Sequence, residues 1–362
     1  MIRPFDIRDV NAIQRLRPLA RTLAYELIAV DGVNLLRDAV TSYVTGGRDH
    51  NVVLVDRDRT GADAFGLMHI LSDAAHDQNA ADRRAQQHRA ALILMAPGPQ
   101  SDEAVESWMY LAREFCSYAA SHGVHHVIAE PPEYGGEAEA LHGAGFAPLI
   151  HQDVFKLASL DRDARDARDA EPPSVPGLRD VTKADDPLIR LLHMRTAPKM
   201  TYQAEITSDL LRATTPSDEG WVLAQNNEVV GYLAIREGKR GYGLQMMFRP
   251  KAEELAKPML QYALHRLSKR KPAPVYCTVR AYQSWVLPVL DDLGFSHITS
   301  TVLMVRHTAA RVHQPVWSAI PEPAFAAVTK AITRHRATIN RVKRELSLNY
   351  DQRDRSITRR KS

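Results

Sequence analysis

The sequence of 362 residues has little cysteine and no long apolar run. Its two cysteines, Cys116 and Cys277, fall one in each half without a motif around them, which is typical of reduced core residues. The longest apolar stretch, Ala90 to Ala96, suits a strand and is far too short to span a bilayer. The first residues carry charge where a secretion signal needs an apolar run. We therefore expect a cytoplasmic protein without a membrane segment.

The sequence also lacks the common motifs of nucleophilic and phosphate-transfer enzymes. It contains no Gly-x-Ser-x-Gly, no phosphate-binding Gly-Lys-Ser/Thr and no Cys–His arrangement. His122, His125 and His126 lie across an expected helix–strand junction, and no cysteine or carboxylate stands at ligand spacing from them. The sequence therefore predicts no metal site.

Positive charge is gathered at one end of the chain. The formal net charge is +4 at pH 7. The segment from Arg311 onward has twelve Lys and Arg against four acids, which makes it +8 and leaves the rest of the chain at −4. A basic tail can meet nucleic acid or acidic protein, whereas the body shows no sign of a basic groove. Nucleic-acid binding is therefore not expected of the body.

One short phrase occurs twice. Leu141 to Phe146 reads Leu-His-Gly-Ala-Gly-Phe, Leu290 to Phe295 reads Leu-Asp-Asp-Leu-Gly-Phe, and an alternating segment follows each. In both places we expect a short helix that stops at glycine, a Phe in the core and then a strand. Because the same order of elements precedes both phrases, the sequence predicts two copies of one domain.

The periodicity of the first half predicts six strands and four helices. Its expected strands are 2–7, 50–55, 65–71, 90–95, 124–129 and 147–157, and its expected helices are 13–23, 34–44, 101–122 and 137–142. Ser101 caps the long helix, whose apolar residues form one face.

The second half repeats this order. Its expected strands are 178–181, 221–225, 229–236, 243–248, 275–279 and 298–305, and its expected helices are 187–195, 208–214, one beginning near Leu255 and a short one before Gly294. We interpret the chain as domain 1 (1–157), a charged, Pro-rich linker (158–177), domain 2 (178–308), a basic helix (309–350) and a disordered tail (351–362).

The tail has its own apolar pattern. Between Phe325 and Leu346, apolar residues recur in steps of three and four with only His335 polar, which predicts a helix with a narrow apolar seam. Three interpretations stay open: the helix lies along its own body, the seam associates two copies of the chain, or the basic segment contacts nucleic acid.

The order of elements, the hairpin before a central strand and the two Gly-Phe endings together resemble the GNAT superfamily of acyl-CoA-dependent N-acyltransferases. The resemblance covers roughly 1–157 and 175–308. It implies an α/β fold of the α+β mixed-sheet kind, with two tandem GNAT-like domains whose central sheets are flanked by helices. It also implies that acyl-CoA binds in a notch where the fourth and fifth strands of a domain diverge, with its pyrophosphate at the amino end of the long helix.

The family's phosphate loop reads roughly Arg/Gln-x-x-Gly-x-Gly/Ala, and both halves depart from it. In the first half Gln100 fits the leading position, but Glu103 stands where the first glycine is expected. The second half has no glycine there and offers Arg249, Lys251 and Lys257 instead, so it is the preferred site for acetyl-CoA. The residues expected to contact acyl-CoA are Met95 and Gln100 in the first half and Met246, Met247, Phe248, Lys251 and Lys257 in the second.

The resemblance also implies a tyrosine that protonates the departing thiolate, five residues before the Phe of each Gly-Phe pair. Leu141 and Leu290 occupy those positions, so Tyr134 and Tyr282 are the substitutes. A general base is also needed, because the attacking amine must lose its proton. Glu130, after the fifth strand of the first half, and Glu237, after the hairpin of the second, are the candidates.

Two functions remain open on this reading. In the first, the protein transfers an acetyl or acyl group from acyl-CoA to a primary amine of a small molecule or protein. In the second, both halves are GNAT-shaped binding or assembly modules without catalysis, and the helix 325–346 mediates homo-oligomer formation. No membrane partner is expected in either case.

Overall fold

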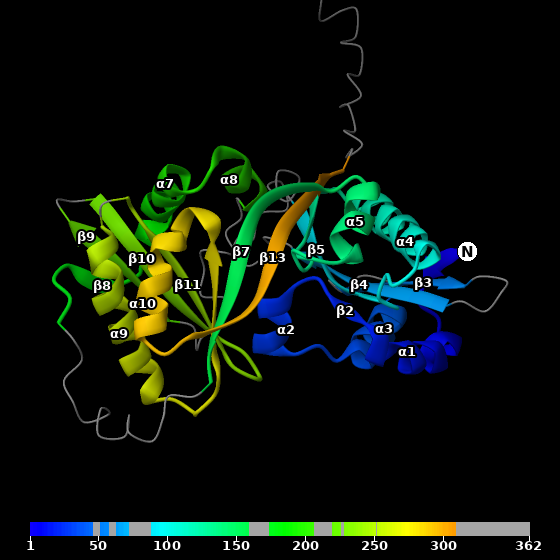
Figure 1. Cartoon of the computed structure of the whole chain (residues 1–362), viewed down its shortest axis with the longest axis horizontal. Helices are drawn as coiled ribbons and strands as arrows, with labels where there is room; N and C mark the ends of the chain where they lie inside the picture. Colours follow the sequence, from blue (N-terminus) through cyan, green and yellow to red (C-terminus); the bar gives the residue numbers. More distant parts are fainter. Residues whose placement is uncertain are drawn as a thin grey trace, which may run out of the picture. The chain divides into compact units, whose positions relative to one another are not determined.

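The computed structural model in Figure 1 describes residues 1–45, 51–57, 63–71, 88–158, 174–205, 219–225, 228–250 and 252–308. These residues belong to one compact unit. The predicted loop 72–87, the predicted helix 208–214, most of the linker 158–177 and the tail from 309 lie outside the described residues. The tail helix 325–346 and its three interpretations therefore remain predictions.

The described strands form one mixed sheet of thirteen strands. Its order is β1-β3-β4-β5-β6-β13-β7-β12-β11-β10-β9-β8, and β2 pairs with β5 outside this path. The first-half strands are β1 (Ile2–Pro4), β2 (Arg21–Thr22), β3 (Asn51–Arg57), β4 (Asp63–Leu71), β5 (His88–Ala96), β6 (Val124–Ala129) and β7 (Ala147–Leu157). The second-half strands are β8 (Leu178–Asp180), β9 (Glu219–Gln225), β10 (Glu228–Glu237), β11 (Tyr242–Phe248), β12 (Val275–Arg280) and β13 (Ser296–His307). The predicted mixed α/β class is confirmed.

Helices cover both faces of this sheet. They are α1 (Val10–Leu16), α2 (Tyr25–Asp31), α3 (Leu35–Val44), α4 (Asp102–Ser121), α5 (Gly136–Gly143), α7 (Asp186–Thr196), α8 (Lys199–Glu205), α9 (Ala256–Ser268) and α10 (Leu287–Asp292). The long helices α4 and α9 bury their apolar faces in two separate cores, one in each half. α1 and α3 pack on the opposite face in the first half, and α7 does so in the second.

The first helix is shorter than its periodicity predicts. α1 stops at Leu16, a 3-10 turn with Pro18 follows, and Leu23 lies beyond the short strand β2. Pro18 has no N–H and cannot continue the helical hydrogen bonding. Leu23 is fully buried, but it enters the core from an extended segment rather than from a helix.

The two Gly-Phe phrases adopt the same conformation, as predicted. Gly145 and Gly294 have φ of 93° and 80°, in the region that favours glycine. The N–H groups of Phe146 and Phe295 each donate to the carbonyl five residues earlier, on Leu141 and Leu290, at 3.0 Å. Both Phe side chains are buried. The leucines that stand at the expected tyrosine positions are fully buried core residues.

A second repeated feature supports the duplication and is not evident from periodicity. Arg3 donates two hydrogen bonds of 2.8 Å to Asp9, and Arg179 donates two of 2.7 and 2.5 Å to Asp185. In each half the arginine lies on the first strand, and the aspartate six residues later also accepts from a backbone N–H that opens the first helical turn. The two aspartates are buried. Each half therefore joins its first strand to its first helical turns by the same ion pair.

The last strand of each half is paired in the other half. β7 leaves the first half and pairs with β12 and β13, while β13 returns from the second half and pairs with β6 and β7 (Figure 1). Val302 and Met304 of β13 belong to the first-half core, and Phe155 and Leu157 of β7 pack on the second-half core. Neither half completes its own sheet. The sequence predicts each last strand but not its exchange.

Candidate functional site

The two central parallel strands diverge in each half, and we call the place where they separate the notch of that half. In the first half β5 and β6 pair as far as Ala91 and Ile128. In the second half β11 and β12 pair from Tyr242 and Val275 as far as Leu244 and Cys277. The family resemblance assigns acyl-CoA to this place, so the question for each notch is whether it leaves space for acyl-CoA.

The first-half notch is filled by the protein's own backbone. β2 lies on the β6 side of β5, with Arg21 opposite Met95. The N–H of Leu23 donates to the Ile93 carbonyl at 2.8 Å, and the Leu23 carbonyl accepts from the N–H of Glu130 at 2.7 Å. Residues 21–23 therefore bridge the ends of β5 and β6. The expected contact of Met95 with acyl-CoA would require this strand to leave.

The amino end of α4 is also closed to a diphosphate. The N–H of Gly98 donates to the Leu19 carbonyl and that of Gln100 to the Gly98 carbonyl, each at 2.9 Å. The N–H of Ala104 donates to Ser101 Oγ at 3.3 Å, which confirms Ser101 as the helix cap. Donors used inside the loop are not available to phosphate oxygens. The side chain of Gln100 is exposed beside this loop.

The other two first-half candidates are Tyr134 and Glu130. Tyr134 is 85% exposed, in a segment before α5, so it has no shielded path to a thiolate. Glu130 follows β6, and its backbone N–H is used by Leu23. Glu130 therefore stands at the edge of the filled notch, whereas Tyr134 lies at the surface.

The second-half notch is occupied by one side chain rather than a strand. Gln283, in the 3-10 segment after β12, is only 5% exposed, and its Nε2 donates to the Met246 carbonyl at 3.0 Å. Met246 and Phe248 face the core under α9, while Met247 faces α7 on the other side of the sheet. The expected acyl-CoA contacts in this half are therefore limited to the backbone of β11.

The cations expected near the diphosphate are paired with carboxylates. Lys257 Nζ lies 2.7 Å from Asp292 of α10, and Arg249 Nη1 lies 2.7 Å from Glu228. These exposed pairs are weak, so an incoming anion can compete for either cation. Pro258 removes one N–H from the first turn of α9. Lys251 lies outside the described residues.

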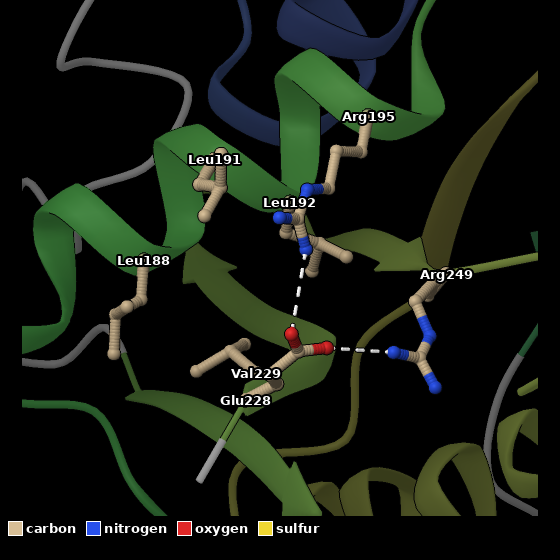
Figure 2. Close-up of a pocket in the computed structure, with 7 residues that line it drawn as sticks. All are labelled: Leu188, Leu191, Leu192, Arg195, Glu228, Val229 and Arg249. Atoms are coloured by element: carbon tan, nitrogen blue, oxygen red, sulfur yellow. Dashed lines mark hydrogen bonds and ion pairs between the residues drawn. The ribbon is translucent and has the colours of Figure 1, made fainter.

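A small groove lies between α7 and the β9–β10 hairpin (Figure 2). Leucines of α7 form its apolar side, and Glu228 stands between Arg249 and Arg195, whose Nη1 is 3.8 Å away. Its volume of about 50 Å³ is far below the roughly 300–1,000 Å³ of ordinary small-molecule sites. The groove cannot hold an acyl-CoA.

Tyr282 and Glu237 lie at opposite ends of the second-half sheet. Glu237 pairs with Tyr242 at the start of β11, and it accepts a hydrogen bond of 2.8 Å from Arg270. Tyr282 follows the far end of β12 and is half-buried near the notch. Six residues of extended chain, about 20 Å, separate Tyr242 from Phe248. Glu237 and Tyr282 are separate candidates of the sequence, and Tyr282 is the one that follows the end of β12 next to the notch.

A carboxylate that the sequence analysis missed lies at the second-half notch. The first-half helix α2 packs on β11 and β12, where Thr278 Oγ1 donates to Glu26 Oε2. Arg236 pairs with Asp31, and the N–H of Arg240 donates to the Val30 carbonyl at 2.8 Å. Thr278 is one residue beyond the last pair of β11 with β12. Glu26 therefore stands where these strands begin to diverge.

Gly243 makes room for this carboxylate. A Cβ at Gly243 would lie 3.0 Å from Glu26 Oε1, which is tighter than nearly all real contacts of that kind. The sequence has no periodic pattern that predicts α2. Glu26 and Thr278 are also 252 residues apart in the chain. The available signals were Glu26, an acid in the first turn of α2, and Gly243, a glycine on the central strand β11. Nothing in the sequence connects these two residues.

A Ser–His–Asp cluster on the exchanged strands does not form a nucleophilic triad. Ser300 Oγ donates to Asp153 at 2.5 Å, and His297 Nε2 lies 3.1 Å from that Oγ and 3.4 Å from Asp153. A triad needs the serine and the aspartate on different nitrogens of the imidazole. Here one nitrogen faces both groups, so the serine is not activated.

The two thiols are equally unsuited to nucleophilic chemistry. Burial raises the pKa of Cys116 to about 12. Burial first, and then the nearby charge of Glu26, raises the pKa of Cys277 as well. A thiol that stays protonated at neutral pH is a poor nucleophile.

Neither a metal-binding cluster nor a membrane-length helix occurs in the described part of the chain. No three His, Cys, Asp or Glu residues there are grouped to hold a metal ion. None of the described helices is both long enough and apolar enough to cross a bilayer.

Comparison with known proteins gives similarity of structure without similarity of sequence. No protein-family model and no curated protein matches the sequence. A GCN5-related N-acetyltransferase from Sphaerobacter thermophilus matches with 15% identity and a TM-score of 0.49, over 85% of this chain and 95% of that one. One from Anabaena variabilis matches with 14% identity and a TM-score of 0.38, over 85% and 73% of the two chains. A tandem GNAT protein from the clavulanic acid biosynthesis pathway matches with 16% identity and a TM-score of 0.44, over 85% and 98%. The solved structures to which this chain is similar thus include N-acetyltransferases of the GNAT kind, one of them a tandem GNAT protein.

Proposed function

We propose that this protein is an acyl-CoA-dependent N-acyltransferase whose second half carries the reaction. The observation that supports this most is the difference between the notches. The first-half notch is bridged by the backbone of residues 21–23, whereas the second-half notch is crossed by a side chain, that of Gln283. The first half then serves to complete the sheet and to supply α2.

In this proposal the thioester arm of acetyl-CoA lies against the backbone of Met246, Met247 and Phe248. Gln283 gives up its hydrogen bond to the Met246 carbonyl when the arm enters. The acceptor nitrogen attacks the thioester carbonyl, a C–N bond forms and the C–S bond breaks. The amine proton goes to the Glu26 carboxylate, directly or through a water, and Tyr282 protonates the departing thiolate. Lys257 pairs with the phosphates after leaving Asp292.

A second candidate function is a GNAT-shaped assembly protein without catalysis. The pairing of Lys257 and Arg249 with carboxylates and the hydrogen bond of Gln283 favour it, because all three occupy groups that acyl-CoA needs. In this case the helix expected at 325–346 mediates association, as the sequence suggests.

Acetyl-CoA binding distinguishes the two candidates. Acetyl-CoA at a hundred times its dissociation constant is expected to stabilise the protein by about 2.7 kcal/mol. Asp292→Ala should tighten binding two- to fivefold because it frees Lys257, and Lys257→Glu should weaken it at least tenfold. Gln100→Glu, at the closed first-half loop, is the control and should change nothing. Thermal shift and titration calorimetry measure all four proteins. The absence of any shift or heat at millimolar acetyl-CoA would favour the assembly protein.

A further inference from the structure

Three polar side chains form a row where the exchanged strands meet. Gln152 of β7 lies opposite Arg280 of β12 on one side and opposite Thr301 of β13 on the other. Residues directly opposite one another in a sheet point to the same face. Phe155 and Val302 point to the other face, toward the cores under α9 and α4. The row therefore lies on the face that carries α2 and α7.

The centre of this row has hydrogen-bonding capacity that the chain does not use. Gln152 and Thr301 are each 2% exposed. Neither the Oε1 nor the Nε2 of Gln152 has a hydrogen-bond partner among the described residues, and the same holds for Thr301 Oγ1. A buried amide without partners is costly, and native proteins rarely retain one. A glutamine amide can donate twice and accept twice, so a ligand with both a donor and an acceptor matches it.

The row lies beside the carboxylate at the second-half notch. Thr278 stands two residues before Arg280 on the same strand and face, and its hydroxyl holds Glu26. Thr278 is the diagonal neighbour of Gln152 across β12 and β7, at a distance of roughly 7 Å. The Gln152 amide and the hydroxyl that holds the Glu26 carboxylate therefore lie on one face, apart by about the length of a molecule of a few heavy atoms.

We propose that Gln152 and Thr301 bind the acceptor, and that the acceptor is a small primary amine that also carries a hydroxyl or amide group. The amine lies at Glu26 and the neutral polar group at Gln152. This inference rests on the proposed function. The binding site is shared by both halves, since β7 and α2 come from the first and β12 and β13 from the second.

The stability of two glutamine variants tests the site without any substrate. Gln152→Leu replaces an unpartnered buried amide by an apolar side chain, so the melting temperature should rise by about 2–4 °C. The matched control is Gln283→Leu, which removes an equally buried amide that does have a partner and should lower the melting temperature. A fall for Gln152→Leu similar to that of the control would overturn the proposal, because Gln152 would then support the fold.

Acceptor preference is the second test. With acetyl-CoA and release of the CoA thiol as the readout, ethanolamine is expected to have at least tenfold higher kcat/KM than propylamine, its apolar analogue of equal size. Gln152→Leu should bring the ratio close to one through KM, with acetyl-CoA binding unchanged. Equal values for the two amines in the wild type, or no transfer to either while acetyl-CoA binds, would overturn the acceptor assignment. Failure to bind acetyl-CoA would count against the proposed function instead, and the melting temperatures would still decide whether Gln152 is a binding residue.

Discussion

Replacing Asp185 by alanine is expected to lower the free energy of unfolding by about 2–3 kcal/mol, because it removes a buried carboxylate whose hydrogen bonds come partly from a half-exposed guanidinium. Asp185 accepts two hydrogen bonds from Arg179 and two from Thr182, at 2.5–2.9 Å, and is 2% exposed. Its loss leaves the first-turn N–H without this acceptor and the guanidinium with the Asp180 carbonyl, at 3.3 Å. Urea unfolding at pH 7 measures the change. Asp292→Ala removes an exposed pair and should cost less than about 1 kcal/mol, so equal losses in the two variants would contradict the prediction.

The same aspartate predicts a pH dependence. The hydrogen bonds from Arg179 hold the pKa of Asp185 well below its usual range. Because the folded-state pKa is lowered, the unfolded chain binds the proton more readily. The stability that Asp185 contributes is therefore complete above about pH 5 and is lost as the pH falls below about 4. Asp185→Asn should reduce the acid-induced loss of stability, measured as unfolding free energy between pH 7 and pH 3. If the unfolding free energy of Asp185→Asn fell with pH as steeply as that of the wild type, Asp185 would not be the source of the acid-induced loss.

Neither half is expected to fold when it is produced without the other. Without the second half, β6 loses β13, and the eleven residues of β7 lose both neighbouring strands. Without the first half, β12 loses β7, and β13 loses both of its neighbours, β6 and β7. Unpaired edge strands of this length favour aggregation. Residues 1–158 and 174–362, produced apart, should therefore give insoluble or aggregated protein without a cooperative unfolding transition.

Co-production supplies the control for this prediction. The two pieces should co-purify in equal amounts through a tag on either one, because every strand then finds its partner. They should also recover the cooperative transition of the full chain. A stable folded monomer of either piece alone, measured by size-exclusion chromatography and circular dichroism, would show that the strands can return to their own halves.

Local features of the fold were predictable from the sequence because their causes are local. Ser101 marks the start of α4, and Gly145 and Gly294 mark the turns into the last strands, since capping and positive φ depend on neighbouring residues. The strand exchange has no such signal. β7 and β13 are strands of similar length that each follow a Gly-Phe phrase, and neither carries a local feature that selects β6 or β12 as its neighbour. The sequence defines these strands but not their partners.

The candidate site was harder to predict, for the same reason. Glu237 stands at the end of a central hairpin strand, as a base could, but that end lies at the start of β11, where its carboxylate accepts a hydrogen bond from Arg270. Glu26 reaches the notch only because α2 crosses to the other half. Residues 21–23 are too few to show a strand pattern, so the closure of the first-half notch could not be foreseen. Tyr282 and the β11 contacts remain predictions.

The exchange of last strands also bears on the history of the duplicated gene. A copy that no longer performs its chemistry is ordinarily free to be deleted. Here deletion of the first half would remove a strand from the second, along with the helix that carries Glu26. Selection on the second half alone is then enough to retain the first. The first half can lose its ligand-binding groups while its fold is preserved, and a filled notch in a half that still lends its last strand is the outcome that such a history would leave.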